Sequence, residues 1–377
     1  MARIIANYLP QFHETKENNI WWGKGYTDWT AVKRAKPLFR GHDQPKRPLD
    51  DYYYDLSNSE SIKWQVDLAK KYGIYGFGIY HYWFDNDNVM LRKPSEQLLK
   101  MADLDIHYMF IWDNASWRRT WSNIKDCSND WAPQFDNKAL PDQDGYLIKL
   151  EYGDENRWKE HFDYLLQYFK DERYIKIDGK PVFGVFNQTN HPEVLKRMID
   201  FWEKMAIKAG FDGIEVIGRY NNQNCKVTAK EFYYEPIWSG WIPNTVVKKI
   251  SNKVKVFLQE KLNIPMKYNY DLVWKRILHN ARKSERDVYL SGFVSYDDSP
   301  RRGMKGKVVV GASPRKFEIY LRKLLRISEA QNKEYVFLTA WNEWGEGAYL
   351  EPDYKGYDYL EAIRNVVNEK KNIDKSI

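Results

Sequence analysis

Residues 335–352 read YVFLTAWNEWGEGAYLEP, and this stretch sets the expectations for the rest of the chain. Its first part, Tyr335–Thr339, consists of residues with strand-forming character. Two carboxylates, Glu343 and Glu346, follow within a turn that contains two glycines. The pattern predicts a buried strand that delivers two acids to a pocket.

The spacing of the two acids makes them a candidate catalytic pair. Residues three apart on a strand point to opposite faces, so Glu343 and Glu346 can share a cavity only if the chain leaves β geometry just after Trp341. Gly345 makes such a turn easy. In a turn or helix the two Cβ atoms lie about 5–6 Å apart, near the separation at which paired carboxylates act on a glycosidic bond. The alternative is a solvated loop with two surface acids, but the flanking Trp341 and Trp344 favour a site.

The composition fits a soluble globular protein with an unusually high aromatic content. Of the 377 residues, 43% are hydrophobic, 29% are charged and 16% are aromatic, with 16 Trp and 28 Tyr. Trp and Tyr beyond the needs of a core favour ligand surfaces, because their flat rings stack and their N–H or O–H groups find polar partners. The net charge of +7 is spread over 59 basic and 52 acidic residues, which argues against a nucleic-acid binder.

Several features favour a cytoplasmic protein. The two cysteines, Cys127 and Cys225, exclude a disulfide framework and favour a reducing compartment. The N-terminal residues look like a first strand rather than a signal peptide, and no run of about 18 apolar residues predicts a transmembrane segment. The lysines from Lys248 to Lys261 accompany apolar residues at helical spacing. For this segment a solvated helix face is favoured over peripheral contact with an anionic membrane surface.

Strand-like runs alternate with helical segments along the chain. The alternation specifies a parallel sheet, and eight units over this length fit an α/β fold of the (β/α)₈ TIM barrel type, with loop and helical insertions, better than an open doubly wound sheet. No GxGxxG follows a strand-like run, so a dinucleotide fold is not expected. We expect residues 1–377 to form one domain, with a helical insertion around residues 240–285. Strands are expected at Arg3–Leu9, Gly73–Phe84, Ile106–Asp113, Pro181–Asn187, Gly213–Arg219, Glu231–Glu235, Tyr289–Tyr296 and Tyr335–Trp341, and helices at Ser59–Tyr72, Ser95–Ala102, Arg157–Phe169 and Pro192–Ala209.

Polar and aromatic side chains gather where the predicted strands end. In (β/α)₈ barrels the carboxyl ends of the strands carry the active site. Each residue alone is typical of a cap or a turn, but their joint placement at one end favours a binding cleft. They are His13 after the first strand, His81, Tyr82 and Trp83 at the second, Trp112, Asp113 and Asn114 at the third, Asn187 at the fourth, Tyr296, Asp297 and Asp298 at the seventh, and Glu343 and Glu346 at the eighth.

Other chemistries have less support in the sequence. It contains no HExxH or HxH zinc pattern, no GxSxG elbow and no Walker loop, so we expect neither a metal nor a cofactor. There is no DxD in a Rossmann-like context and no glycine-rich phosphate loop, which are the usual signs of a nucleotide-sugar site.

Motifs spread over the chain add a family resemblance. They read YLPQFH, WWGKGYTDW, AKPLFRGHDQP, YYYDL, GIYHYWF, IWDNASWRRTW, RYIKIDGKPVF and AWNEWGEGAYLEPD. From about Ala2 to Tyr359 the chain resembles the WbsX family, found among bacterial surface-polysaccharide biosynthesis proteins and also called glycoside hydrolase family 99-like. Family 99 itself comprises retaining endo-acting α-mannosidases on a (β/α)₈ barrel. The resemblance implies that Glu343 assists the sugar's own 2-hydroxyl and that Glu346 is general acid and then base. Gly345 stands where the hydrolases usually carry a histidine.

These features favour a glycan-active enzyme, a retaining glycoside hydrolase or transglycosylase that acts on a bacterial surface-polysaccharide or oligosaccharide intermediate. The alternatives are a glycosyltransferase in O-antigen or capsule biosynthesis and a non-catalytic glycan-binding barrel. The mechanism requires a raised pKa on Glu346 and an ionised Glu343. Arg118 and Arg119 are expected to bind hydroxyls or an acidic substituent. Stacking on sugars is expected from Trp83, Trp112, Trp117, Trp341 and Trp344. The expected substrate-binding residues are Tyr8, His13, Trp22, His81, Tyr82, Trp83, Trp112, Asn114, Trp117, Arg118, Arg119, Asn187, Asp297, Trp341, Asn342 and Trp344.

Overall fold

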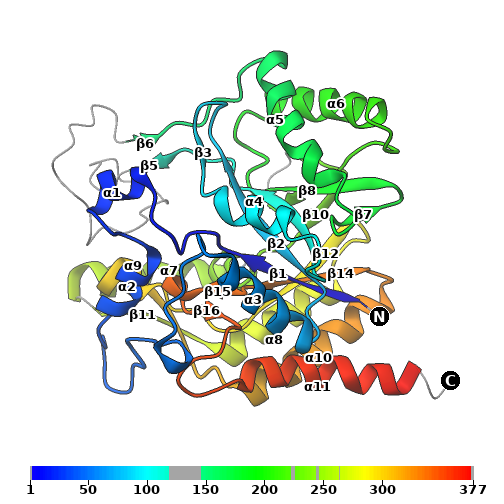
Figure 1. Cartoon of the computed structure of the whole chain (residues 1–377). Helices are drawn as coiled ribbons and strands as arrows, with labels where there is room; N and C mark the ends of the chain where they lie inside the picture. Colours follow the sequence, from blue (N-terminus) through cyan, green and yellow to red (C-terminus); the bar gives the residue numbers. More distant parts are fainter. Residues whose placement is uncertain (1, 119–145, 222–225, 243–245, 263, 375–377) are drawn as a thin grey trace.

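Eight parallel strands form a closed barrel in the computed structural model of the chain (Figure 1), which describes residues 2–118, 146–221, 226–242, 246–262 and 264–374. Each strand pairs with the next, and the eighth returns to the first, with Tyr335 opposite Arg3. The predicted barrel is therefore confirmed, and every expected strand is present. The barrel strands are β1 (Arg3–Tyr8), β2 (Gly76–Trp83), β4 (His107–Trp112), β8 (Lys180–Val185), β9 (Glu215–Arg219), β10 (Lys230–Phe232), β12 (Val288–Phe293) and β14 (Tyr335–Thr339).

Side chains along each barrel strand alternate between the barrel interior and the surrounding helices. Strand β2 shows both sets. Phe77 and Ile79 line a small cavity together with Leu98 of a surrounding helix, so they point outward. Tyr80 points inward, because its hydroxyl lies 2.8 Å from that of Tyr234, which follows β10 across the barrel. This alternation decides which strand residues reach the site.

Seven helices in the described part of the chain surround the barrel (Figure 1). Four of them have a capped first turn, because the side chains of Asn58, Asp154, Asn269 and Ser313 each accept a hydrogen bond from a backbone N–H. The four helices expected from the sequence are present to within two residues at each end. The surrounding helices are α3 (Ser59–Lys71), α4 (Lys93–Lys100), α5 (Glu155–Phe169), α6 (Pro192–Lys208), α8 (Tyr270–Arg282), α10 (Pro314–Ala330) and α11 (Asp358–Asp374).

Further elements are inserted between strands and helices. In Figure 1 α1, α2, α9 and β11 lie on the left, at the end toward which the strands run, and both termini lie on the right. Within residues 240–285, α7 and β11 are inserted, whereas α8 belongs to the outer helices. No helix in the described residues has the length and apolar character to cross a membrane. The insertions are α1 (Lys16–Trp22), α2 (Asp28–Arg34), η1 (Leu49–Asp51), β3 (Val89–Met90), β5 (Trp117–Arg118), β6 (Tyr146–Ile148), β7 (Lys176–Ile177), η3 (Ile237–Trp241), α7 (Val246–Leu262), β11 (Met266–Asn269), α9 (Ser299–Arg302), η4 (Gly303–Lys305) and β13 (Lys307–Val310).

Much of the aromatic content lies in the core. One cluster of buried hydrophobic residues extends from Ala2 to Val367. Part of the tryptophan content that suggested ligand surfaces therefore serves packing. The largest fully buried side chains include Trp112, Trp202, Trp274, Trp341 and Trp344.

Trp274 tests this role in packing. Its ring stacks between Phe293 at 5.6 Å and Tyr320 at 5.4 Å, and it is fully buried. We expect Trp274→Ala to reduce the free energy of unfolding by about 3–5 kcal/mol, because it removes a large side chain and leaves a cavity. Leu272→Ala on the same helix is the control, since Leu272 is 53% exposed and its loss costs about 0.5 kcal/mol or less. Equal midpoints of chemical denaturation for the two variants would contradict the packing.

Candidate active site

The two acids of the ExxE motif follow the last barrel strand. After β14 the chain forms β15 (Asn342–Glu343), the turn η5 (Trp344–Glu346) and β16 (Ala348–Tyr349). The side-chain amide of Asn342 ties this segment to β1, because its Oδ1 accepts from the N–H of Leu9 at 2.7 Å and its Nδ2 donates to the carbonyl of Leu9 at 3.0 Å. The chain turns after the strand, as the spacing of the two acids requires.

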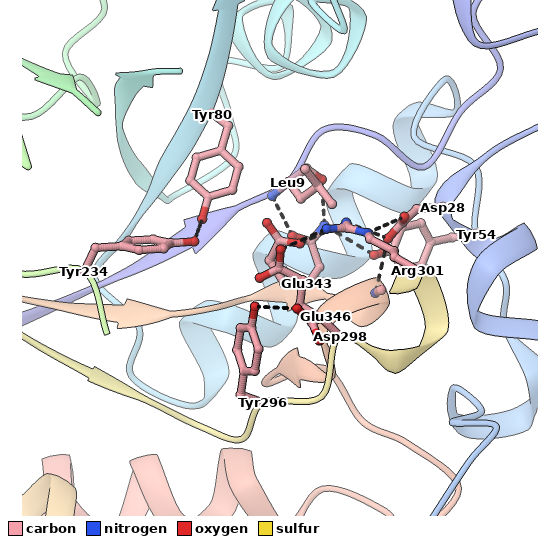
Figure 2. Close-up of polar contacts among 12 residues, drawn as sticks. Leu9, Asp28, Tyr54, Tyr80, Tyr234, Tyr296, Asp298, Arg301, Glu343 and Glu346 are labelled. Carbon is pink, nitrogen blue, oxygen red and sulfur yellow. Dashed lines mark hydrogen bonds and ion pairs between the residues drawn. The ribbon is translucent and has the colours of Figure 1, made fainter. Parts of the chain in front are cut away.

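A buried arginine joins the two acids (Figure 2). Arg301 Nη2 lies 3.2 Å from Glu343 Oε2, and Nη1 lies 3.0 Å from Glu346 Oε1. Its Nε and Nη2 also lie 3.1 Å from the two carboxylate oxygens of Asp28, the first residue of α2. Although burial acts to lower it, the charges of these three carboxylates hold the pKa of Arg301 well above its ordinary value. The acids of the motif thus converge on one cation.

The absence of a side chain at Gly345 has a steric reason. A Cβ atom there would lie 2.4 Å from Arg301 Nε and 2.6 Å from Asp28 Oδ2. The backbone N–H of Gly345 also donates to Asp28 Oδ2 at 3.2 Å. The arginine and the aspartate therefore occupy the space that a histidine between the acids would need.

The two acids differ in exposure. The side chain of Glu343 is 5% exposed and that of Glu346 is 24% exposed. Burial and the neighbouring Glu346 raise the pKa of Glu343 to about 8, against the opposing charge of Arg301. The sequence analysis expected a raised pKa on Glu346 and an ionised Glu343. The structure instead raises the pKa of Glu343, because it is the more deeply buried acid.

Buried tyrosines surround the acids. Tyr80 from β2 and Tyr234 after β10 share a hydrogen bond, and Tyr296 after β12 donates to Asp298 at 3.3 Å (Figure 2). Burial raises the pKa values of these three tyrosines well above the ordinary value. The charges of nearby acids and tyrosines act in the same direction, and Glu346 is among those charges for each of the three. Their hydroxyls remain neutral, and the member of the Tyr80–Tyr234 pair that accepts the shared hydrogen bond can donate its own proton to a ligand.

A further buried acid, Glu351, holds the segment that carries the ExxE motif in place. Glu351 accepts hydrogen bonds from the indole of Trp344 at 2.6 Å, from Gln65 at 2.7 Å and from the hydroxyl of Tyr54 at 2.8 Å. Burial raises its pKa to about 7, while these neutral donors act in the opposite direction. Tyr8 donates to Gln65 at 2.7 Å and so belongs to this network rather than to the cleft.

Three predicted binding residues lie outside the barrel wall, which corrects the expectation that they line the cleft. His81 Nε2 lies 2.8 Å from His161 Nε2, and the ring of Trp83 stacks on His161 at 4.1 Å. Trp112 contacts the same histidine at 5.2 Å and is 1% exposed. His161 belongs to α5, so the alternation of side chains along each strand directs these three toward that helix.

Other predicted residues hold loops together. Asn114 donates to the carbonyl of Asn187 at 2.6 Å and accepts from its N–H at 2.7 Å, which joins the segments after β4 and β8. The Asn187 side chain accepts from Thr189 and Asn190 within its own turn. Asp297 accepts from His42 at 2.8 Å and from Gln44 at 2.5 Å. These bonds occupy the side chains that were expected to bind a sugar.

Four other predicted residues fall into two groups. Trp341 and Trp344 are fully buried, so their rings offer no face for stacking. Tyr82 and Trp117 contact each other at 5.2 Å, and the charge of Glu343 contributes to the raised pKa of Tyr82, after burial and Asp113. These two residues therefore stay at the site.

Four further predicted residues are placed less directly. Trp22 is buried, with its ring 5.9 Å from that of Tyr26. His13 is buried as well, and its burial lowers its pKa to about 4. For Arg118 the structure describes the backbone in β5, and Arg119 lies outside the described residues.

Sequence reasoning missed several residues of the site. Arg301 follows the seventh strand end within SPRRGMKG, and this pair of arginines close to an acidic strand end is the signal that could have indicated it. Asp28 lies in the WWGKGYTDW motif but was not singled out as a partner of the acids. Tyr80 and Tyr234 could have been found by following the alternation of side chains along their strands.

Comparisons with known proteins agree with this architecture. Residues 4–363 match the model of the family described as Glycosyltransferase WbsX. A relative named WxcX and described as uncharacterized, from Xanthomonas campestris pv. campestris, is 28% identical over 379 residues. The match covers 99% of this chain and 50% of WxcX, so the chain spans about half the length of the curated relatives it matches.

Solved structures share the fold. A GH99 endo-alpha-mannosidase from Bacteroides thetaiotaomicron superimposes with a TM-score of 0.57 and 14% identity, covering 100% of this chain and 99% of that one. A second structure, described as a glycoside hydrolase-like protein, gives a TM-score of 0.57 and 12% identity over 97% of this chain and 93% of that one. Because the family model matches nearly the whole sequence, the chain belongs to the glycosyltransferase WbsX family.

Proposed function

We propose that the chain is a retaining glycoside hydrolase or transglycosylase whose catalytic acids are Glu343 and Glu346. The observation that carries the proposal is the convergence of these two carboxylates on Arg301 at the carboxyl end of the barrel. Neutral tyrosine hydroxyls surround them and suit a polyhydroxylated ligand. The structural similarity to an endo-alpha-mannosidase supports an α-mannoside as the first substrate to test.

The two acids take different roles in this proposal. Glu346 protonates the leaving oxygen, because its side chain is the more exposed of the two and the leaving group must reach it. Glu343 removes the proton of the substrate's 2-hydroxyl. The environment that raises the pKa of Glu343 to about 8 makes its ionised form a stronger base than an ordinary carboxylate.

The bonds change in two steps. First, the 2-oxygen attacks the anomeric carbon as the leaving oxygen departs with the proton of Glu346, while Glu343 gains the 2-hydroxyl proton. Water or a sugar hydroxyl then opens the resulting 1,2-anhydro sugar, giving its proton to Glu346, and Glu343 returns its proton to the 2-oxygen. The pair carries one proton and one negative charge at each stage. Arg301 contacts both acids and can balance that charge wherever it resides.

Transfer to a sugar hydroxyl uses the same acids as hydrolysis. The family description favours a glycosyltransferase as the second candidate. In both cases the reaction begins with cleavage of a glycosidic bond, and the acceptor that enters the second step decides the outcome.

The catalytic pair can be tested by substitution. We expect Glu343→Gln and Glu346→Gln each to lower turnover of a cleaved α-mannoside by about 10²–10⁴, the usual contribution of a positioned acid or base. Glu334→Gln is the control, because Glu334 precedes β14 at the opposite end of the barrel and its side chain is 43% exposed. Full activity in both cleft variants would remove the assignment. Binding of glycans without cleavage of any of them would favour a glycan-binding barrel.

The role of the 2-hydroxyl can be tested with a matched pair of substrates. If the sugar participates, a substrate that lacks its 2-hydroxyl binds but is not cleaved. Isothermal titration calorimetry measures the binding, and product analysis measures the cleavage. Trapping of an ester on Glu343 by mass spectrometry would show direct attack by the carboxylate and exclude the assisted route.

The pH dependence tests whether the two acids share one proton. Glu346 donates a proton in the first step and Glu343 accepts one, so the active pair holds a single proton between its two carboxyls. Because the pKa of Glu343 is raised to about 8, the last proton leaves the pair above about pH 8, and kcat/KM should fall about tenfold per pH unit there. Measurement of kcat/KM across this pH range on one substrate checks the fall. A kcat/KM that stays level well above pH 8 would contradict a shared proton.

A further inference from the structure

Arg219 lies at the mouth of the barrel and has no role in the mechanism above. It is the last residue of β9, in register with Phe232 of β10. Its guanidinium carbon lies 5.4 Å from the centre of the Phe186 ring, which follows β8. Both side chains are half-buried, so Arg219 is neither part of the core nor extended into solvent.

Aromatic contacts connect Arg219 with the catalytic pair. The Phe186 ring lies 5.0 Å from Tyr234 and 5.5 Å from Tyr80, the two tyrosines whose hydroxyls are bonded to each other. Arg219 acts to lower the strongly raised pKa of Tyr234, whereas burial and then Glu346 and Glu343 raise it. Tyr234 therefore stands near both the arginine and the two acids.

The guanidinium of Arg219 lacks the partners that other arginines of this chain have. Arg301 contacts three carboxylates, and Arg173 contacts Asp171 and four backbone carbonyls. In the described residues, no carboxylate oxygen lies within ion-pair distance of Arg219. Burial lowers the pKa of Arg219, and the charges of Tyr234 and Asp113 act in the opposite direction. Within the described residues, the N–H donors of Arg219 therefore remain available to a ligand.

We propose that Arg219 binds an anionic substituent, a carboxylate or a phosphate group, on the saccharide in the cleft, so that the substrate is an acidic glycan. A guanidinium presents a planar fork of N–H donors that fits two oxygens of such a group at once. A sugar hydroxyl offers one oxygen and no charge to compensate the desolvated cation. This inference rests on the proposed function only in taking the ligand to be a saccharide.

Chemical protection tests the inference without knowledge of the full substrate. Phenylglyoxal modifies accessible arginines, and peptide mass spectrometry measures the rate at each position. The probes are mannose, mannuronate and mannose 6-phosphate at equal ionic strength. We expect the two acidic probes to slow modification of Arg219 and mannose to leave it unchanged. Arg364, whose side chain is 42% exposed, is the internal control and should react equally in all samples. A difference between the two acids distinguishes a carboxylate from a phosphate ligand.

Variants supply an independent measurement. The affinity of the protein for the better acidic probe, relative to mannose, should fall about tenfold or more in Arg219→Gln, the usual contribution of a charge-assisted hydrogen bond. Arg219→Lys should retain part of the preference. Failure of phenylglyoxal to react at Arg219, or equal protection by neutral and acidic probes, would overturn the proposal.

The outcome is separable from that of the catalytic proposal. Binding is measured in the Glu346→Gln background, where no cleavage is needed. A preference for acidic probes in a protein that cleaves no glycoside would support Arg219 and remove the catalytic assignment. Cleavage of neutral glycosides without a preference for acidic probes would support the catalytic assignment and remove the proposed role of Arg219.

Discussion

The guanidinium of Arg301 carries a positive charge into a space almost closed to water, where Asp28, Glu343 and Glu346 provide the compensating charge. Removing one partner from a buried ion pair commonly costs about 3–5 kcal/mol, because the remaining charge is left unpaired. The three acids come from an N-terminal helix and from the segment after the last strand, and the arginine comes from the segment after the seventh strand. One electrostatic cluster therefore joins three segments at the carboxyl end of the barrel and places the acids that the proposed chemistry needs.

The neighbouring buried acid, Glu351, is stabilised by neutral hydrogen-bond donors. Glu351 is held by an indole, an amide and a hydroxyl, with no cation among the three. Trp344, between the two acids of the ExxE motif in sequence, donates one of these hydrogen bonds, and its ring also stacks on Tyr349 at 3.8 Å. A fully buried indole with a satisfied N–H has little freedom to rotate. Packing and hydrogen bonds around Trp344, together with the ion pairs to Arg301, therefore fix the position of the segment that carries Glu343 and Glu346.

The fold could be read from the sequence because its signals are local. A buried parallel strand is a short apolar run, and the eight runs were recognisable one at a time. The ExxE pair was recognisable for the same reason. The direction of side chains was harder to predict: His81, Trp83 and Trp112 were assigned to the cleft by their position at strand ends, whereas alternation sends them to α5. Arg301 could not be assigned as a partner of the acids, because that contact spans 42 residues of sequence and depends on how the barrel closes. The raised pKa of Glu343 likewise depends on burial, which no motif specifies.

The close approach at Gly345 links three positions that are far apart in the sequence. With Arg301 and Asp28 within 2.6 Å of where a Cβ would stand, a larger residue at this position requires that both be replaced or moved. A glycine-to-histidine change alone would collide with the ion pair, and loss of the ion pair alone would leave a charged acid and a void. A histidine between the two acids therefore requires that Gly345, Arg301 and Asp28 change together or that one change compensates another. Related sequences should accordingly retain all three residues or replace all three.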